Sequence, residues 1–145
     1  MGQEEVAASR RLIDEAFNQG NLGVIDEMCA DDFVDHDPIM GDQDREGVKR
    51  TIGGYRQAFP DIHIDVLDVV AADDKVVYRW QGDGTFENEF MGQQPTGEKG
   101  DPVNGITIDR FEGGKIVESW SQWDVLTLMR DIGVMPEGAA AAAGG

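Results

Sequence analysis

The stretch that decides the fold is GGKIVESWSQWDVLTLMRDIG, residues 113–133. Its two glycines are typical of a tight turn between antiparallel strands. The next nine residues, KIVESWSQW, alternate in character as a β-strand does. A short helix over residues 125–132 should follow. Asp124 stands where a helix N-cap belongs and Gly133 where a helix ends, so we expect Asp124 to be a capping residue.

We expect further strands before this stretch. VNGITIDRF, ending at Phe111, is the expected hairpin partner, and it places Arg110 where it can pair with Glu118. IHIDV alternates with a period of two after Pro60. KVVYRWQGDGTFENEFMG indicates a long strand that bends at Gly82 and Gly84.

The first 59 residues show helical spacing instead. Apolar positions indicate helices over residues 4–18, 24–29 and 47–59. The segment DDFVDHDPIMGDQD between the last two is expected to be a turn-rich loop with a brief extended piece at Phe33 and Val34.

Helices first and strands after predict an α+β domain. We expect a cone-shaped, curved antiparallel sheet of four long strands, packed on the N-terminal helices and followed by a C-terminal helix. Residues 1–136 should form this single domain. Residues 137–145, GAAAAAGG with its preceding Glu, have nothing to anchor them, and we expect a disordered tail or a remnant of cloning.

The amino-acid composition argues against several classes of binding partner. The 145 residues carry 29 acidic and 12 basic side chains, a net charge of −17. Such a field repels phosphate backbones and anionic lipids, so we expect no nucleic-acid or membrane partner. Cys29 is the only cysteine, and no signal peptide or membrane span is apparent, which favours a cytoplasmic protein. The acidity suits either a salt-rich environment or simple solubility.

The residues that could carry chemistry are few. His63 shares a strand face with Asp65 and should be exposed, whereas His36, in FVDHDP, could be an acid/base group or a loop histidine bonded to its neighbours. Asp35 and Asp37 flank it, but the spacing fits no calcium loop, and we expect no metal. Phosphate-binding loops and nucleophilic-serine motifs are also missing from the sequence. The aromatic residues Trp80, Trp120, Trp123, Phe86 and Phe90 could line a pocket or fill a core.

Four ordered segments carry a family resemblance: FNQGNLGVIDEMCADDFVDHDP, FPDIHIDVLDVVAADDKVVYRW, EFMGQQPTGEKG and ITIDRFEGGKIVESWSQWDVLTLMRDIG. Together they resemble the SnoaL-like polyketide cyclases of the ketosteroid isomerase and nuclear transport factor 2 superfamily. The resemblance covers roughly residues 4–133.

This resemblance implies a cone with a deep apolar pocket, often a homodimer formed through the sheet, and ring closure by intramolecular aldol condensation without metal or cofactor. It also implies that the family's acid/base aspartate falls on Ser121, and a partner residue, often histidine, on Thr107. Strand parity puts Asp109 on the same face as Thr107. We therefore expect Asp109 and His36 to be the acid/base pair, with Ser121 orienting the substrate.

Two functions follow. In the first, the protein abstracts a proton from carbon in a small, apolar, carbonyl-rich molecule, leading to cyclisation or isomerisation. Thr107, Trp80, Phe86 and Trp123 would then line its pocket. In the second, the protein is a non-catalytic small-molecule-binding or dimerisation module that has kept the cone and lost the base. Ligand stabilisation without chemical change would distinguish the second from the first.

Overall fold

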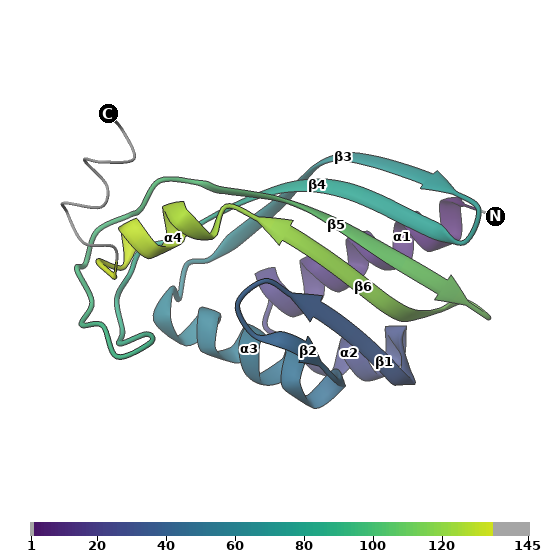
Figure 1. Ribbon diagram of the computed structural model, residues 1–145, viewed down its shortest axis with the longest axis horizontal. Coiled ribbons are helices and arrows are strands. Elements are labelled where there is room, and N and C mark those ends of the chain that lie inside the picture. Colours follow the sequence, from purple (N-terminus) through teal and green to yellow (C-terminus); the bar gives the residue numbers. More distant parts are fainter. Residues whose placement is uncertain (1, 135–145) are drawn as a thin grey trace.

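A computed structural model describes residues 2–134 of the chain. It confirms the predicted α+β architecture, in which a curved sheet bends over the N-terminal helices and a short C-terminal helix lies at one end (Figure 1). The expected tail at residues 137–145 lies outside the described residues. Among the described residues, no helix is both long and apolar enough to cross a membrane.

The helices lie close to where their apolar spacing predicts them. Helix α1 continues directly into a π-helical turn, η1, so the expected helix over residues 4–18 is present in two forms. The helical bounds are α1 Gln3–Leu12, η1 Ile13–Asn18, α2 Gly23–Met28, α3 Arg45–Ala58 and α4 Val125–Asp131. Asp44 caps α3 by accepting a hydrogen bond from the Gly47 backbone N–H, and Asp124 caps α4 in the same way through Thr127. Gly133 ends α4 with φ +81°, as expected of a residue that follows a helix.

The sheet has six strands in the order β2-β1-β6-β5-β4-β3, two more than expected. Their bounds are β1 Cys29–Asp37, β2 Gly41–Gln43, β3 His63–Ala72, β4 Lys75–Asp83, β5 Val103–Glu112 and β6 Lys115–Trp123. The expectation of a loop after α2 is wrong, because β1 occupies that segment and pairs in parallel with β6. The sheet is therefore mixed, and only the strands from β6 to β3 form the expected antiparallel run.

Two further details differ from the sequence analysis. Strand β4 ends at Asp83, and the chain then leaves the sheet until β5 instead of continuing as one bent strand. The irregularity expected near Gly82 is absent from the β4 pairings, which run unbroken to that residue. Register shifts occur elsewhere, in β3 after Val66 and in β6 beside Val117. The second shift puts Ile116 on the buried face although Glu118 lies on the other one.

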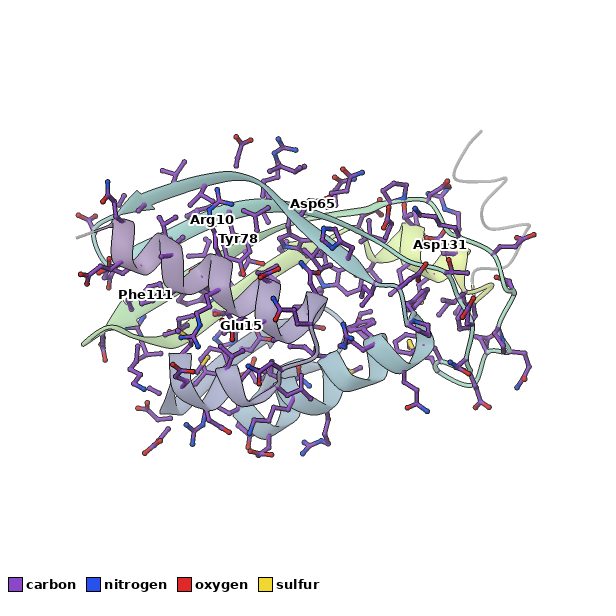
Figure 2. All side chains as sticks on the ribbon, turned by 180° about the vertical axis from the view of Figure 1, so that it is seen from behind. Arg10, Glu15, Asp65, Tyr78, Phe111 and Asp131 are labelled. Carbon is purple, nitrogen blue, oxygen red and sulfur yellow. The ribbon has the colours of Figure 1, made fainter. Side chains whose placement is uncertain are left out.

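Buried apolar side chains form two clusters. The larger lies between the sheet and helices α1, α2 and α3, and includes Tyr78 and Phe111, which Figure 2 shows on their strands behind α1. The smaller lies beneath α4, where Leu128 and Ile132 pack on Phe59 and Phe86. The two clusters enclose the space described next.

Candidate active site

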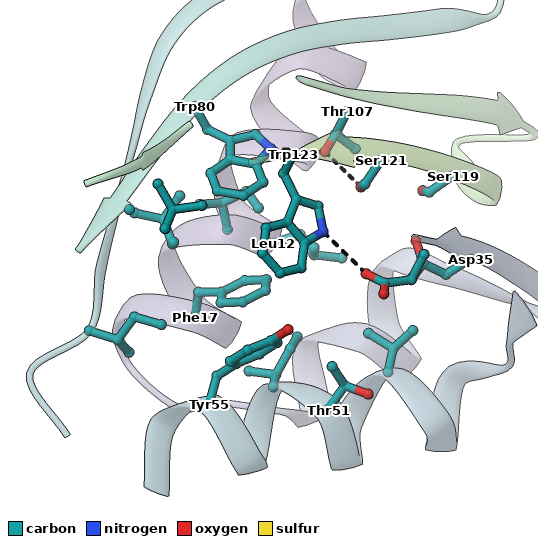
Figure 3. Close-up of a pocket in the computed structure, with 18 of the residues that line it drawn as sticks. Leu12, Phe17, Asp35, Thr51, Tyr55, Trp80, Thr107, Ser119, Ser121 and Trp123 are labelled. Atoms are coloured by element: carbon teal, nitrogen blue, oxygen red, sulfur yellow. Dashed lines mark hydrogen bonds between the residues drawn. The ribbon is translucent and has the colours of Figure 1, made fainter. Parts of the chain in front are cut away.

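A pocket of about 180 Å³ lies on the concave side of the sheet. This volume is more than ten times the roughly 10–15 Å³ that one water molecule needs. Its lining residues come from the helical segments α1, η1, α2, α3 and α4 and from all six strands. Apolar side chains dominate the lining, among them Leu12, Phe17, Ile52, Tyr55, Trp80 and Trp123, most of which are labelled in Figure 3. A mostly apolar hollow of this kind is typical of small-molecule sites.

Strand pairing brings the polar lining together in two rows. Asp35 on β1 lies beside Ser119 on β6, and Ser119 lies beside Asp109 on β5. The next row along the strands pairs Ser121 with Thr107. Because alternate residues of a strand share a face, both rows point into the pocket.

Thr107 and Ser121 form one connected hydrogen-bond chain with Trp80. The Trp80 indole N–H donates to Thr107 Oγ1 at 3.0 Å, and the Thr107 and Ser121 hydroxyl oxygens are 2.9 Å apart (Figure 3). Trp80 can lie across the sheet because residue 105 is glycine, where a Cβ would come within 2.3 Å of its ring. Sequence reasoning placed Trp80, Thr107 and Ser121 in the pocket, and all three are among its lining residues.

Asp109 is the deepest carboxyl group, with 2% of its surface exposed. Each carboxylate oxygen accepts one hydroxyl hydrogen bond, from Ser9 Oγ at 2.7 Å and from Ser119 Oγ at 2.6 Å. Burial raises the Asp109 pKa, and the two hydrogen bonds oppose that shift only in part. Asp109 is among the lining residues of the pocket, but protein hydroxyls already donate hydrogen bonds to both of its oxygens.

Asp35 has the properties that an acid/base group needs, and sequence reasoning did not select it. Burial raises its pKa to about 7, and the nearby Asp37 and Asp109 carboxylates add to the rise. Within residues 2–134, no hydrogen bond to its side chain is found. Its carboxyl group is therefore uncommitted. The signal that could have found it was its parity with Phe33, had β1 been recognised as a strand.

His36 occupies a different environment. Its ring nitrogens contact Asp42 Oδ1 at 2.6 Å and Glu118 Oε2 at 2.7 Å, and its ring stacks on Trp120 with centroids 5.6 Å apart. These carboxylates raise the His36 pKa. His36 pairs with Trp120, one residue out of step with the Asp35 row, so it lies on the opposite, convex face. The structure does not bring His36 and Asp109 together.

Of the other residues singled out from the sequence, some lie where we expected them and others do not. Trp123 lines the pocket, and its indole N–H makes a long contact of 3.5 Å with Asp37 Oδ2. Phe86 does not line the pocket, because it is 1% exposed and stacks on Phe59 within the smaller core cluster. Glu118 pairs with Arg110 at 3.2 Å, as expected. In the part of the chain that the structure describes, no three His, Cys, Asp or Glu side chains are grouped so that they could hold a metal ion.

A family model described as SnoaL-like polyketide cyclase matches residues 7–132. The chain belongs to this family. Solved structures agree with the assignment. AclR, a proposed hydroxylase from Streptomyces galilaeus, is 27% identical, with a TM-score of 0.83 over 94% of this chain and 100% of that one. IdmH, a proposed polyketide cyclase from Streptomyces antibioticus, is 32% identical, with a TM-score of 0.76 over 89% of this chain and 98% of that one.

A SnoaL-like protein from Jannaschia sp. CCS1, 22% identical with a TM-score of 0.82 over 93% of this chain and 95% of that one, shares the fold. No curated protein sequence matches the chain. Similar SnoaL-like folds thus accompany relatives described by different reactions, a cyclisation and a hydroxylation. The reaction of this member has to be argued from its own pocket.

Proposed function

We propose that this SnoaL-like protein is an enzyme that abstracts a proton from carbon in a small, apolar, carbonyl-rich substrate and so promotes its cyclisation or isomerisation. The observation that carries the proposal is Asp35, a mostly buried carboxyl group with no hydrogen bond to residues 2–134 and a pKa raised to about 7. A base whose pKa lies near the working pH combines a useful ionised fraction with the strongest driving force for proton transfer.

The reaction needs only groups that can move one proton. Asp35 takes the proton from a carbon beside a carbonyl group, and the electron pair of the broken C–H bond forms an enolate. For ring closure, the enolate carbon bonds to a second carbonyl carbon, and the resulting alkoxide takes the proton back from Asp35. For isomerisation, the proton returns to another carbon. Either route conserves all atoms and leaves Asp35 ionised again.

Ser121 is suited to hold a substrate oxygen. Because Thr107 Oγ1 already accepts the Trp80 N–H, its own proton can go to Ser121 Oγ. The Ser121 proton is then available to a ligand in the pocket. These hydrogen bonds fit the role of orienting the substrate that we expected for Ser121. They give Thr107 and Trp80 the role of fixing the direction of the Ser121 hydroxyl.

Asp109 enters the proposal as a neighbour that tunes Asp35. A carboxylate that accepts two hydroxyl hydrogen bonds is a weaker base than an uncommitted one, because both bonds favour its ionised form. Its charge, when present, raises the Asp35 pKa. Asp109 should therefore influence the pH at which Asp35 works more than the proton transfer itself.

Kinetics on a panel of bicyclic β,γ-unsaturated ketones and aryl polyketones tests this assignment. kcat/KM should rise with pH and level off above about pH 7, the pKa of Asp35. Asp35→Asn should lower kcat/KM by about 10²-fold or more, the size of a general-base contribution. Asp109→Asn should retain more activity and move the midpoint of the pH profile downward. A panel member that binds and stabilises the protein but is never converted would favour the non-catalytic alternative.

A further inference from the structure

Tyr55 on α3 carries an unmatched hydrogen-bonding group. Its hydroxyl is the one buried side-chain polar atom, among the residues that the structure describes, that has no hydrogen-bond partner. Burial raises the Tyr55 pKa, with Asp37 contributing, so the hydroxyl keeps its proton and remains a donor. An unmatched buried hydroxyl destabilises a fold, and natural proteins keep few of them.

The position of Tyr55 relates this hydroxyl to the pocket. Tyr55 is among the lining residues, and Figure 3 shows its side chain rising from α3 towards Trp123. Its ring lies against Phe90, with centroids 5.2 Å apart, and meets the Trp123 ring edge-on at 6.4 Å. Packing against Phe90 and Trp123 fixes the orientation of the Tyr55 ring and therefore the direction of its hydroxyl.

The charges around the pocket restrict what this donor can bind. The lining side chains of formal charge are all aspartates, namely Asp35, Asp37, Asp83, Asp101, Asp109 and Asp131. Within the described range, Lys, Arg and His do not contribute to the lining. Bringing a carboxylate or phosphate into an apolar space walled by these groups is unfavourable, since like charges repel strongly where water is scarce. The acceptor for Tyr55 should therefore be an uncharged oxygen.

We propose that the Tyr55 hydroxyl donates a hydrogen bond to an uncharged carbonyl oxygen of the bound ligand, and that the pocket accepts a ketone, quinone or ester while it rejects the matching carboxylate. This inference deepens the proposed function, because it names the substrate group that α3 recognises opposite the strand that carries Asp35. The carbonyl oxygen of the ligand supplies the hydrogen-bond partner that no residue of the described range gives the Tyr55 hydroxyl.

The test compares two probes of one shape, 2-acetonaphthone and 2-naphthoate, by isothermal titration on the unsubstituted protein and on Tyr55→Phe. The unsubstituted protein should prefer the ketone. Tyr55→Phe should weaken ketone binding about threefold to tenfold, the effect of one net hydrogen bond, and leave naphthoate binding unchanged. Tyr55→Phe should also raise the thermal midpoint by about 2 °C or more, since it removes an unpaired buried hydroxyl.

Tyr78→Phe is the matched control for stability. Tyr78 is also buried, at 4% exposed, but its hydroxyl is not the unpartnered one, so the same substitution at Tyr78 should not raise the thermal midpoint. Unchanged ketone binding by Tyr55→Phe, a lowered midpoint in that variant, or no ketone binding by the unsubstituted protein would each overturn the inference. Ketone binding that depends on Tyr55 without turnover of any substrate would leave the inference standing and refute the proposed enzymatic function.

Discussion

Replacing Asp35 by Asn should make the protein more stable at neutral pH, although it should remove activity. The carboxyl pKa is about 7 in the fold and 3.8 when unperturbed. The folded state therefore binds more protons between these values, and stability falls as pH rises through them. At 1.36 kcal/mol for each unit, the ionised side chain destabilises the fold by about 4 kcal/mol above pH 7. Asn cannot ionise and does not incur this loss.

Urea unfolding followed by tryptophan fluorescence measures the difference. The sequence pI of about 4.2 makes strongly acidic conditions unsuitable, because the protein would lose the net charge that keeps it dispersed. Between about pH 5.5 and about pH 8.5, the advantage of Asp35→Asn over the unsubstituted protein should grow by roughly 2 kcal/mol. Asp31→Asn is the control, because the Asp31 side chain is 99% exposed. Parallel pH dependences for Asp35→Asn and the unsubstituted protein would refute the raised pKa and the role built on it.

Three further substitutions test other parts of the structure. Asp124→Ala removes the cap of α4 and should lower the free energy of unfolding by about 0.5–2 kcal/mol in urea. Thr107→Val leaves the Trp80 N–H without its partner, so it should destabilise the protein by about 1–3 kcal/mol and alter the tryptophan emission; an unchanged spectrum would contradict the hydrogen bond. The raised His36 pKa stabilises the fold below pH 6.5, and that contribution is lost as pH rises through the folded value. His36→Gln should therefore weaken the protein at about pH 6 and match it at about pH 9.

Local chemistry made the C-terminal part of the fold predictable. Gly113 and Gly114 both have positive φ, 58° and 80°, as the turn of a two-residue hairpin requires. Asp124 and Gly133 bracket α4 through contacts within a few residues. Because these signals need no distant partner, a sequence reveals them directly.

Strand β1 could not be found in this way, and the Asp35 carboxyl group, whose pKa burial raises to about 7, was missed with it. Its burial pattern does not alternate cleanly, and its aspartates and following Pro38 resemble a loop. The partner that makes it a strand is β6, and the contact between His36 and Glu118 spans 82 residues. The inward direction of Asp35 and the outward direction of His36 both follow from that distant pairing.

The parallel pairing of β1 with β6 also has a consequence for the order in which the molecule forms. A ribosome delivers β1 before α3 and the strands β3, β4 and β5, and only after these does it deliver β6, which completes the ladder of β1. Non-local pairings of this kind are slow to form. Until β6 pairs with it, the edge of β1 can pair with strands of other chains. The pocket should therefore form only after β6 has been synthesised. Pulse proteolysis of chains stalled before Lys115 would show this as persistent cleavage around Phe33.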